Sequence, residues 1–493
     1  MFAYVVSCFA LVAGAQDFTT SYKPLGSYRP AKLLVKSIGD SYDISIKTLS
    51  EHKSSEVKKE IKKSITELRK DFIQLDSLHQ IMDSDNLTAY MRGIVKRIQE
   101  KNPSIADRKF KLFTYRTLVP NASSHGGGLL LINLDMIQKL SSEAQLAFVI
   151  GHEIGHDVLN HVMDGIVKRA QYLDDMDFKQ ELKRLKYLTY NSNKEIENLY
   201  LRVMARFGEH SRENETQADS ISLMLCHNAG YSAYASVISV GKLDSLDEPL
   251  YSDSIAFHAN FDFKECAFKR EWLKAEDNDL GGNLDSIYKI PDSLKTHPDC
   301  KLRADNLRAL IRAKKFSDDS LAPDTASGYD PFRKIAQFEA VETSMNGSYY
   351  SQALFDALQL RTHFPENLYL KCAISNSLFE LYEAEKNHRF SEVCDFPNKE
   401  FSKEYRELLV FLHNISLASL KKVCIVYYNN NISDHVEYEF ASYLGLVVRG
   451  SDMGQEDFQA SISNFIAKNK NSRYSKLLES KKKEKEPSKP KHK

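Results

Sequence analysis

Hydrophobic residues recur at helical spacing over residues 142–158, in the pattern of a long buried helix. Each lies three or four positions from another member of the set, so together they fall on one helix face; they are Leu146, Val149, Ile150, Ile154 and Val158. Ser142 followed by Gln145 is typical of a capping box, and Glu143 in the first turn suits the helix dipole. No proline interrupts residues 141–161. The pattern therefore predicts one helix that begins after Ser142.

A second helix is predicted over residues 211–225. Glu215 and Asp219 are spaced four apart, and apolar residues follow at positions 221, 223, 224 and 225. On a helix this spacing places both carboxylates on one face. Taken alone, such an acidic pair is more typical of a solvated helix face than of a site.

The C-terminal third has the pattern of a separate helical domain. Residues 316–330 read as a linker, and residues 331–425 look helical. Tetratricopeptide-like spacing is legible once, at Gly347, Tyr350, Ala353 and Pro365. An array needs about three repeats, so an ordinary helical hairpin is the alternative. We predict an all-α, tetratricopeptide-like domain with a partner-binding surface over 331–470, and a basic disordered tail over 471–493.

Composition limits the class of protein. A chain of 493 residues should hold two or three domains. Basic and acidic residues balance at 67 each, so no overall field favours nucleic acid as a partner. A hydrophobic share of 42% is that of a normal globular core. Beyond the N-terminal segment, no stretch approaches 18 consecutive apolar residues, so no transmembrane span is expected.

The N-terminal segment has the pattern of a secretory signal peptide. Residues 1–15, MFAYVVSCFALVAGA, are almost wholly apolar and end in Ala13-Gly14-Ala15. We expect cleavage before Gln16, an N-terminal helical segment over 16–84, and an extracytoplasmic protein. Six cysteines remain after cleavage; they permit disulfides, but their pairing cannot be read from the sequence.

Residues 152–156 read His-Glu-Ile-Gly-His inside the first predicted helix. On a helix, His152 and His156 lie on one face, so both imidazoles can reach a single zinc ion. Glu153 lies beside them, close enough to act on a metal-bound water. Such a pentapeptide also arises by chance on helices that carry histidine, so its surroundings decide. The arrangement indicates a hydrolase, most often a peptidase.

Zinc enzymes usually take three protein ligands, so the pentapeptide needs a partner. The metzincin pattern requires glycine at position 159 and histidine at position 162, where this chain has Leu159 and Val162. His161 is one position early and is better explained as a helix-end residue, since histidine suits a last turn. Glu215 on the second predicted helix is the better candidate. Asp219, four residues later, can hydrogen-bond the far nitrogen of a ligand histidine.

Four elements, in order, give the chain a specific resemblance. They are the H-E-x-x-H helix, residues 211–219 as S-R-x-x-E-x-x-A-D, Thr296-His297-Pro298 followed by Arg303 and Leu307, and Asn121-Ala122 with glycines 126–128 and an apolar run at 129–132 before the first helix. Residues 85–310 thereby resemble the gluzincin metallopeptidases of the HtpX and CAAX-prenyl-protease superfamily. Soluble BepA-type periplasmic proteases, which carry a C-terminal tetratricopeptide domain, are closest in layout. A charged insertion within the roughly sixty residues between His156 and Glu215 departs from that pattern.

The resemblance implies a zincin-type α+β metallopeptidase domain, mainly α with a small β-sheet, over residues 85–316. His152, His156 and Glu215 would hold one Zn²⁺ per chain. Glu153 would be the general base, and Asp219 would support a ligand histidine.

Two further segments carry expectations from the resemblance. In the family the His-Pro segment lies close to the active site. His297 would stabilise the tetrahedral intermediate or occupy the open zinc position as a reversible plug; the alternative is a loop histidine that anchors the fold through Pro298 and Arg303. The strand near Asn121 and Ala122 would bind substrate as an extra strand.

Two function classes stay open. The first is a zinc endopeptidase that cuts envelope or misfolded proteins, with envelope assembly machinery as a partner through the helical domain. The second is a chaperone or scaffold with a plugged or silent zinc site. The intact ligand set favours the first. Sequons at Asn121 and Asn214 lie inside the site segments, where a glycan would obstruct the cleft, which favours the bacterial periplasm.

Overall fold

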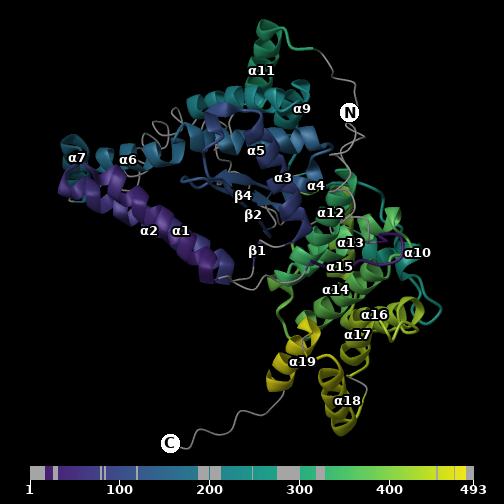
Figure 1. The fold of residues 1–493 in the computed structure, drawn as a ribbon. Helices are drawn as coiled ribbons and strands as arrows, with labels where there is room; N and C mark the ends of the chain where they lie inside the picture. The colour runs from purple at the N-terminus through teal and green to yellow at the C-terminus, as the bar shows by residue number, and fades with distance from the viewer. Residues whose placement is uncertain are drawn as a thin grey trace, which may run out of the picture. The chain divides into compact units, whose positions relative to one another are not determined.

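The computed structural model describes residues 17–25, 32–77, 80–82, 85–117, 120–186, 199, 212–246, 248–274, 300–317, 328–450, 453–470 and 472–484. These residues form two compact units, whose elements are labelled in Figure 1. The first unit comprises the described residues of 25–250 and 300–337, and the second those of 17–24, 251–274 and 338–484. The expected signal peptide, the segment with His297 and residues 485–493 lie outside the described residues. Within the tail predicted to be disordered over 471–493, Arg473–Glu484 form a helix, so the prediction is wrong for that part.

The first unit is built from helices around one small sheet. Its elements are α1 (Lys32–Ser50), α2 (Ser55–Ser77), β1 (Ile81–Met82), α3 (Asn86–Glu100), η1 (Pro103–Ile105), β2 (Lys111–Tyr115), β3 (Ala122–Ser124), β4 (Leu129–Asn133), α4 (Leu134–Lys139), α5 (Glu143–Val158), α6 (His161–Asp174), α7 (Met176–Lys186), a helix over 212–228, α9 (Tyr234–Leu243), α11 (Cys300–Lys314) and the start of α12 (Asp330–Asn346). The strand order is β1-β2-β4-β3, with β2 and β4 parallel and both edge strands antiparallel. The prediction of a mainly α fold with a small sheet is confirmed.

Helices cover both faces of this sheet. On one face, Phe113 and Leu131 belong to a buried cluster with Ile65 of α2 and Met163 of α6; Figure 1 shows α1 and α2 side by side. On the other face lies α3, whose Thr88 hydrogen-bonds a β2 threonine, and α5 contacts β3 and β4. Because side chains alternate between faces, a strand covered on both sides is buried throughout, as β4 is.

The turn between β3 and β4 is anchored to α5. Three consecutive glycines, 126, 127 and 128, have φ of 77°, 62° and 79°, a backbone region that glycine adopts without steric cost. The N–H of Gly128 donates to Oδ2 of Asp157 at 2.7 Å. Arg108 approaches the other oxygen of this carboxylate at 3.4 Å. The hairpin is therefore tied to the C-terminal end of the helix that carries the pentapeptide.

Helix α5 begins where the sequence predicts but ends early. Its cap is Ser142, whose Oγ accepts from the N–H of Gln145 at 3.3 Å. The helix ends at Val158, and Asn160 adopts a left-handed φ of 55°, which asparagine tolerates. His161 is therefore the first residue of α6, and its prediction as a last-turn residue is wrong.

The regular elements described in the second unit are all helices, apart from an isolated bridge between Phe263 and Cys266. Its elements are α10 (Phe257–Phe261), η2 (Arg270–Leu273), the rest of α12, α13 (Tyr350–His363), α14 (Leu368–Lys386), η5 (Phe390–Glu392), α15 (Lys403–Asn414), α16 (Leu417–Asn431), α17 (Glu439–Arg449), α18 (Gln455–Lys468) and α19 (Arg473–Glu484). The strongest packing partners are α13 with α14 and α14 with α16, so helices that follow one another closely in the chain form its core.

An N-terminal segment, residues 17–24, also packs into the second unit. The ring of Tyr22 stacks on Phe338 with centroids 4.7 Å apart, and its hydroxyl donates to Oε1 of buried Glu339 at 2.6 Å. The range expected to form one N-terminal helical segment, 16–84, is thus divided, because α1 and α2 lie in the first unit.

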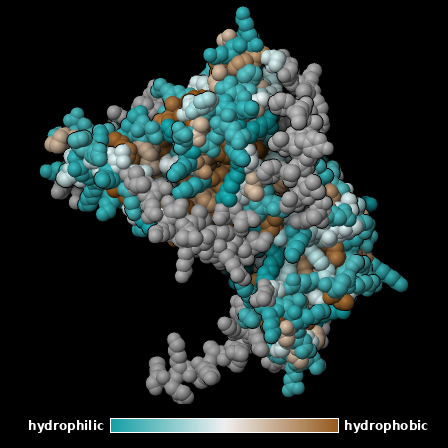
Figure 2. Space-filling model, viewed as in Figure 1, coloured by the Kyte–Doolittle hydropathy of each residue, from teal (hydrophilic) through white to brown (hydrophobic). Residues whose placement is uncertain are grey.

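The surface, the hydrophobicity of the helices and the cysteines each bear on an expectation from the sequence. The described surface on the face in Figure 2 is mostly hydrophilic. Among the described helices, none alone is long and apolar enough to cross a membrane; α15 and α16 pass that test only as a pair, bent by 114° at their junction. Six buried cysteines are free thiols: Cys226, Cys266, Cys300, Cys372, Cys394 and Cys424.

Candidate active site

Two neighbouring helices bring the predicted site residues together. His152, Glu153 and His156 lie on α5, and Glu215 and Asp219 lie on the helix over 212–228. All five are buried except His156, which is half-buried. Residues about sixty positions apart in the sequence thus share one small volume.

Two glycines on α5, one turn apart, permit this close approach. A Cβ on Gly155 would lie 3.1 Å from the backbone of Ala218, and a Cβ on Gly151 would lie 2.7 Å from Oγ of Ser222. Since glycine has no Cβ, the second helix can lie directly against α5. The absence of a Cβ atom at Gly151 and Gly155 therefore positions the helix that carries Glu215.

Replacing Gly155 by alanine should destabilise the protein by about 1–3 kcal/mol, because backbone atoms must shift to admit the methyl group. It should also weaken metal binding, since Glu215 moves with its helix. Urea unfolding and zinc competition measure the two effects. The matched control is Gly165→Ala in α6, where a Cβ meets nothing within 4 Å, and a neutral or stabilising result is expected. Equal behaviour of the two variants would show that close packing does not position Glu215.

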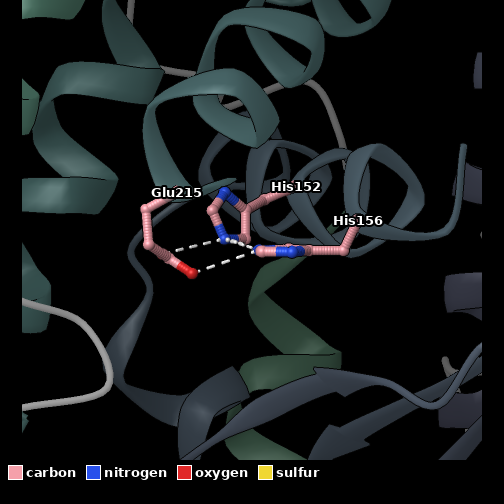
Figure 3. Close-up of side chains that lie close together, drawn as sticks. All are labelled: His152, His156 and Glu215. Atoms are coloured by element: carbon pink, nitrogen blue, oxygen red, sulfur yellow. Dashed lines mark hydrogen bonds and ion pairs between the residues drawn. The ribbon is translucent and has the colours of Figure 1, made fainter. Parts of the chain in front are cut away.

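The side chains of His152, His156 and Glu215 point toward one another (Figure 3). The two Nε2 atoms are 3.0 Å apart, and they lie 3.3 and 3.2 Å from the nearest Glu215 oxygens. Donor atoms held about 2.1 Å from a tetrahedral metal lie roughly 3.4 Å from each other. The spacing therefore suits one small cation held by two nitrogens and a carboxylate, the donor set that zinc accepts.

The position of the hydrogen on the His152 ring is also consistent with a metal site. Its Nδ1 lies 2.9 Å from Oδ1 of Asp219. A carboxylate only accepts, so Nδ1 carries the hydrogen and Nε2 faces the cluster. Burial lowers the pKa of His152, but hydrogen bonds and charge from Asp219 and Glu215 outweigh it and raise the pKa to about 10. The two carboxylates thus favour positive charge at this ring, and a bound cation would supply that charge in place of a second proton.

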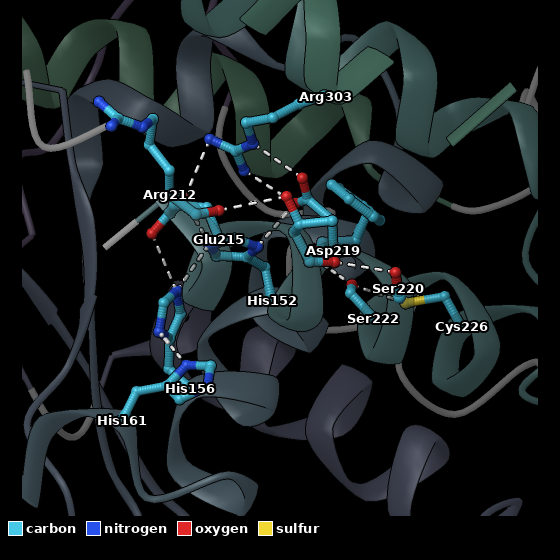
Figure 4. A network of polar contacts seen from close by, with 12 residues as sticks. His152, His156, His161, Arg212, Glu215, Asp219, Ser220, Ser222, Cys226 and Arg303 are labelled. Atoms are coloured by element: carbon cyan, nitrogen blue, oxygen red, sulfur yellow. Dashed lines mark hydrogen bonds and ion pairs between the residues drawn. The ribbon is translucent and has the colours of Figure 1, made fainter. Parts of the chain in front are cut away.

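Arg303 of α11 pairs with both acidic residues (Figure 4). Its Nε and Nη2 donate to Asp219 at 2.7 and 2.8 Å, and its Nη1 lies 3.0 Å from Glu215. Burial alone would raise the pKa of Asp219, but hydrogen bonds from Arg303 and His152 lower it below its usual range. With neutral imidazoles, the buried carboxylates of Glu153, Glu215 and Asp219 exceed this one guanidinium by two charges, which one divalent cation would balance.

The remaining predicted residues fall in different places. Glu153 is buried and follows His152 directly on α5. Asn121 is exposed just before β3, while Ala122 is the first residue of β3 and pairs with Ile132. β3 is an edge strand in contact with α5, so the structure brings this hairpin to the helix of the pentapeptide. His297 lies outside the described residues.

Sequence reasoning missed two contacts at the site. Arg303 was identified as part of the His-Pro element, but nothing in the sequence linked it to Asp219 or Glu215. His161 lies beside His156, with their Nδ1 atoms 3.0 Å apart. The one sequence signal for that placement was Asn160, a residue type that tolerates the left-handed turn.

The region that contains the cluster is similar in sequence to known peptidases. Residues 85–311 match the sequence model described as "Peptidase family M48". The chain is 28% identical over 140 residues to mitochondrial metalloendopeptidase OMA1 of Arabidopsis thaliana, covering 28% of this chain and 27% of the relative. It is 25% identical over 191 residues to mitochondrial metalloendopeptidase OMA1 of Schizosaccharomyces pombe, covering 38% and 53%. The matches span about a quarter and about half of the length of these relatives. The M48 match includes the whole cluster, and together these similarities support a zinc metallopeptidase domain within residues 85–311.

Proposed function

We propose that this protein is a zinc-dependent endopeptidase that hydrolyses internal peptide bonds of protein substrates. The observation that carries the proposal is the convergence of two imidazole nitrogens and a carboxylate within 4.8 Å. His152, His156 and Glu215 would hold the metal. Zinc bound there would polarise the scissile carbonyl and lower the pKa of a bound water to about 7.

The chain's own residues would handle the proton and the substrate. Glu153 would accept a proton from the attacking water and pass it to the leaving amine, as a general base and then a general acid. The substrate would pair with edge strand β3 near Asn121 and Ala122 through main-chain hydrogen bonds. Binding through main-chain hydrogen bonds depends little on the side chains of the substrate, which suits a protease with many substrates.

Asp219 and Arg303 would hold the ligands in place. Asp219 would orient the ring of His152, and Arg303 would offset part of the negative charge of Asp219 and Glu215. His297 is proposed as a transition-state group or a reversible plug. Higher activity of His297→Ala would favour the plug, and collapse of activity would favour the transition-state role.

The biological setting is also a proposal. An apolar N-terminus ending in Ala-Gly-Ala and the layout of the four motifs favour an extracytoplasmic, bacterial periplasmic protein that clears envelope or misfolded proteins. The helical second unit would bind partners such as envelope assembly machinery through tetratricopeptide-like hairpins. The alternative is a chaperone or scaffold with a silent zinc site.

Casein cleavage tests the proposed activity. Wild-type protein should cut casein at internal bonds, lose this activity with a chelator, and regain it with zinc. Mass spectrometry of the fragments separates internal cleavage from trimming of the ends. Bound zinc without cleavage, combined with suppression of casein aggregation, would favour the chaperone instead.

A further inference from the structure

The two ligand histidines have different partners on the side away from the cluster. His152 faces the carboxylate of Asp219, whereas Nδ1 of His156 lies 3.0 Å from Nδ1 of His161. Figure 4 shows His161 beside His156, on the opposite side of the cluster from Arg303. Two neutral ring nitrogens at this distance require that one donates and the other accepts, so the direction of this bond decides which nitrogen of His156 is free.

The direction follows from the neighbours. The Nε2 of Gln217 lies 3.3 Å from Oε1 of Glu213, and a carboxylate only accepts, so the amide nitrogen faces Glu213. The amide oxygen of Gln217 then faces Nε2 of His161, at 3.2 Å, and accepts its proton. Nδ1 of neutral His161 is therefore a lone pair, which accepts the Nδ1 proton of His156. The Nε2 lone pair of His156 is left pointing into the cluster.

We propose that His161, itself oriented by Gln217, is a positioning residue that fixes His156 in the tautomer that binds the metal. The inference rests on the proposed zinc site. The left-handed backbone of Asn160 allows this contact. It separates α5 from α6, so that His161 begins α6 beside the last turn of α5. A carboxylate in this position would add a further negative charge to a cluster that already has an excess of buried carboxylates. The neutral ring of His161 accepts the hydrogen bond without adding that charge.

Zinc affinity of two variants tests the role of His161. His161→Ala removes the acceptor, and its zinc dissociation constant should rise about 10–100-fold, the usual effect of losing such a support. His161→Asn keeps an oxygen on Cγ where histidine has Nδ1, so it can still accept from His156. We expect His161→Asn to recover most of the lost affinity. Competition with a chromogenic chelator measures both variants.

Controls separate this role from packing. Asp164→Ala, on an exposed position of α6, should bind zinc like the wild type. Urea unfolding of the zinc-free proteins reports any structural damage. If His161→Ala binds zinc as tightly as the wild type, or if His161→Asn loses as much affinity as His161→Ala, the positioning role is wrong.

The readout also distinguishes this inference from the proposed activity. A wild-type protein that binds zinc but cuts no peptide bond would overturn the endopeptidase, while the pattern among the His161 variants would still decide the positioning role. A wild-type protein that binds no zinc would overturn both.

Discussion

Replacing Glu153 by glutamine should leave zinc bound and slow peptide hydrolysis by about 10²–10⁴-fold, the range that general-base catalysis contributes. Glutamine keeps the size and the buried position of Glu153 but cannot accept a proton from water at neutral pH. The ligand atoms of the cluster belong to other residues, so the metal site should persist. Zinc content and the rate of casein cleavage, measured on the same preparation, check both halves of the prediction.

A matched carboxylate-to-amide change serves as the control. Asp164→Asn, on an exposed position of α6, should retain both zinc and activity. Normal cleavage by Glu153→Gln would remove Glu153 from the mechanism. Loss of zinc from Glu153→Gln would show instead that this side chain supports the metal.

The largest expected effect on stability belongs to Arg303. Replacing it by methionine, which is similar in length and has no charge, should destabilise the zinc-free protein by about 3–5 kcal/mol, the usual cost of removing one partner of a buried ion pair. The reason is that Asp219 and Glu215 are both buried and both lie within 3.0 Å of the guanidinium. Urea unfolding of the zinc-free protein measures the loss.

Arg308 offers the comparison on the same helix. It pairs with exposed Asp305, so Arg308→Met should have little effect on unfolding. The effect of Arg303→Met should also depend on pH. The pKa of Asp219 is lowered by Arg303, so this stabilisation is present above about pH 4 and is lost as the pH falls through the lowered value. A constant difference between wild type and Arg303→Met from pH 6 to pH 3 would contradict the ion-pair account.

Local patterns were enough to predict the elements that carry the site. The apolar stripe and the cap at Ser142 gave the start of α5, and the spacing of Glu215 and Asp219 gave the second helix. Both patterns depend on residues within two turns of each other, which is the range over which helical periodicity is informative. The family resemblance then supplied the reason to connect two segments about sixty residues apart.

Contacts that depend on tertiary packing could not be predicted from the sequence. Gly151 and Gly155 read simply as weak helix formers, and only the neighbouring helix shows why a Cβ is excluded there. Arg303 was distinguished in the sequence only by the His-Pro element, which does not indicate that its partners are the carboxylates of Asp219 and Glu215. The joining of residues 17–24 to the second unit has no local signal, because its partners lie more than 300 positions away in the chain.

His161 illustrates the same limit at the site itself. Histidine suits a last turn and no proline interrupts residues 141–161, so the sequence predicted that His161 would lie at the end of the helix. One left-handed residue, Asn160, breaks the helix and turns His161 back toward His156. A residue preference describes an average over many helices, and a single backbone torsion can override it.

The central claim is that one metal ion, held by His152, His156 and Glu215, makes this chain an endopeptidase. Zinc titration of the metal-free wild-type protein, with bound zinc and casein cleavage followed together, tests it most directly. The account predicts that the cleavage rate rises in proportion to bound zinc and reaches its plateau at about one zinc per chain. Cleavage by the metal-free protein, or a plateau of bound zinc without cleavage, would contradict it.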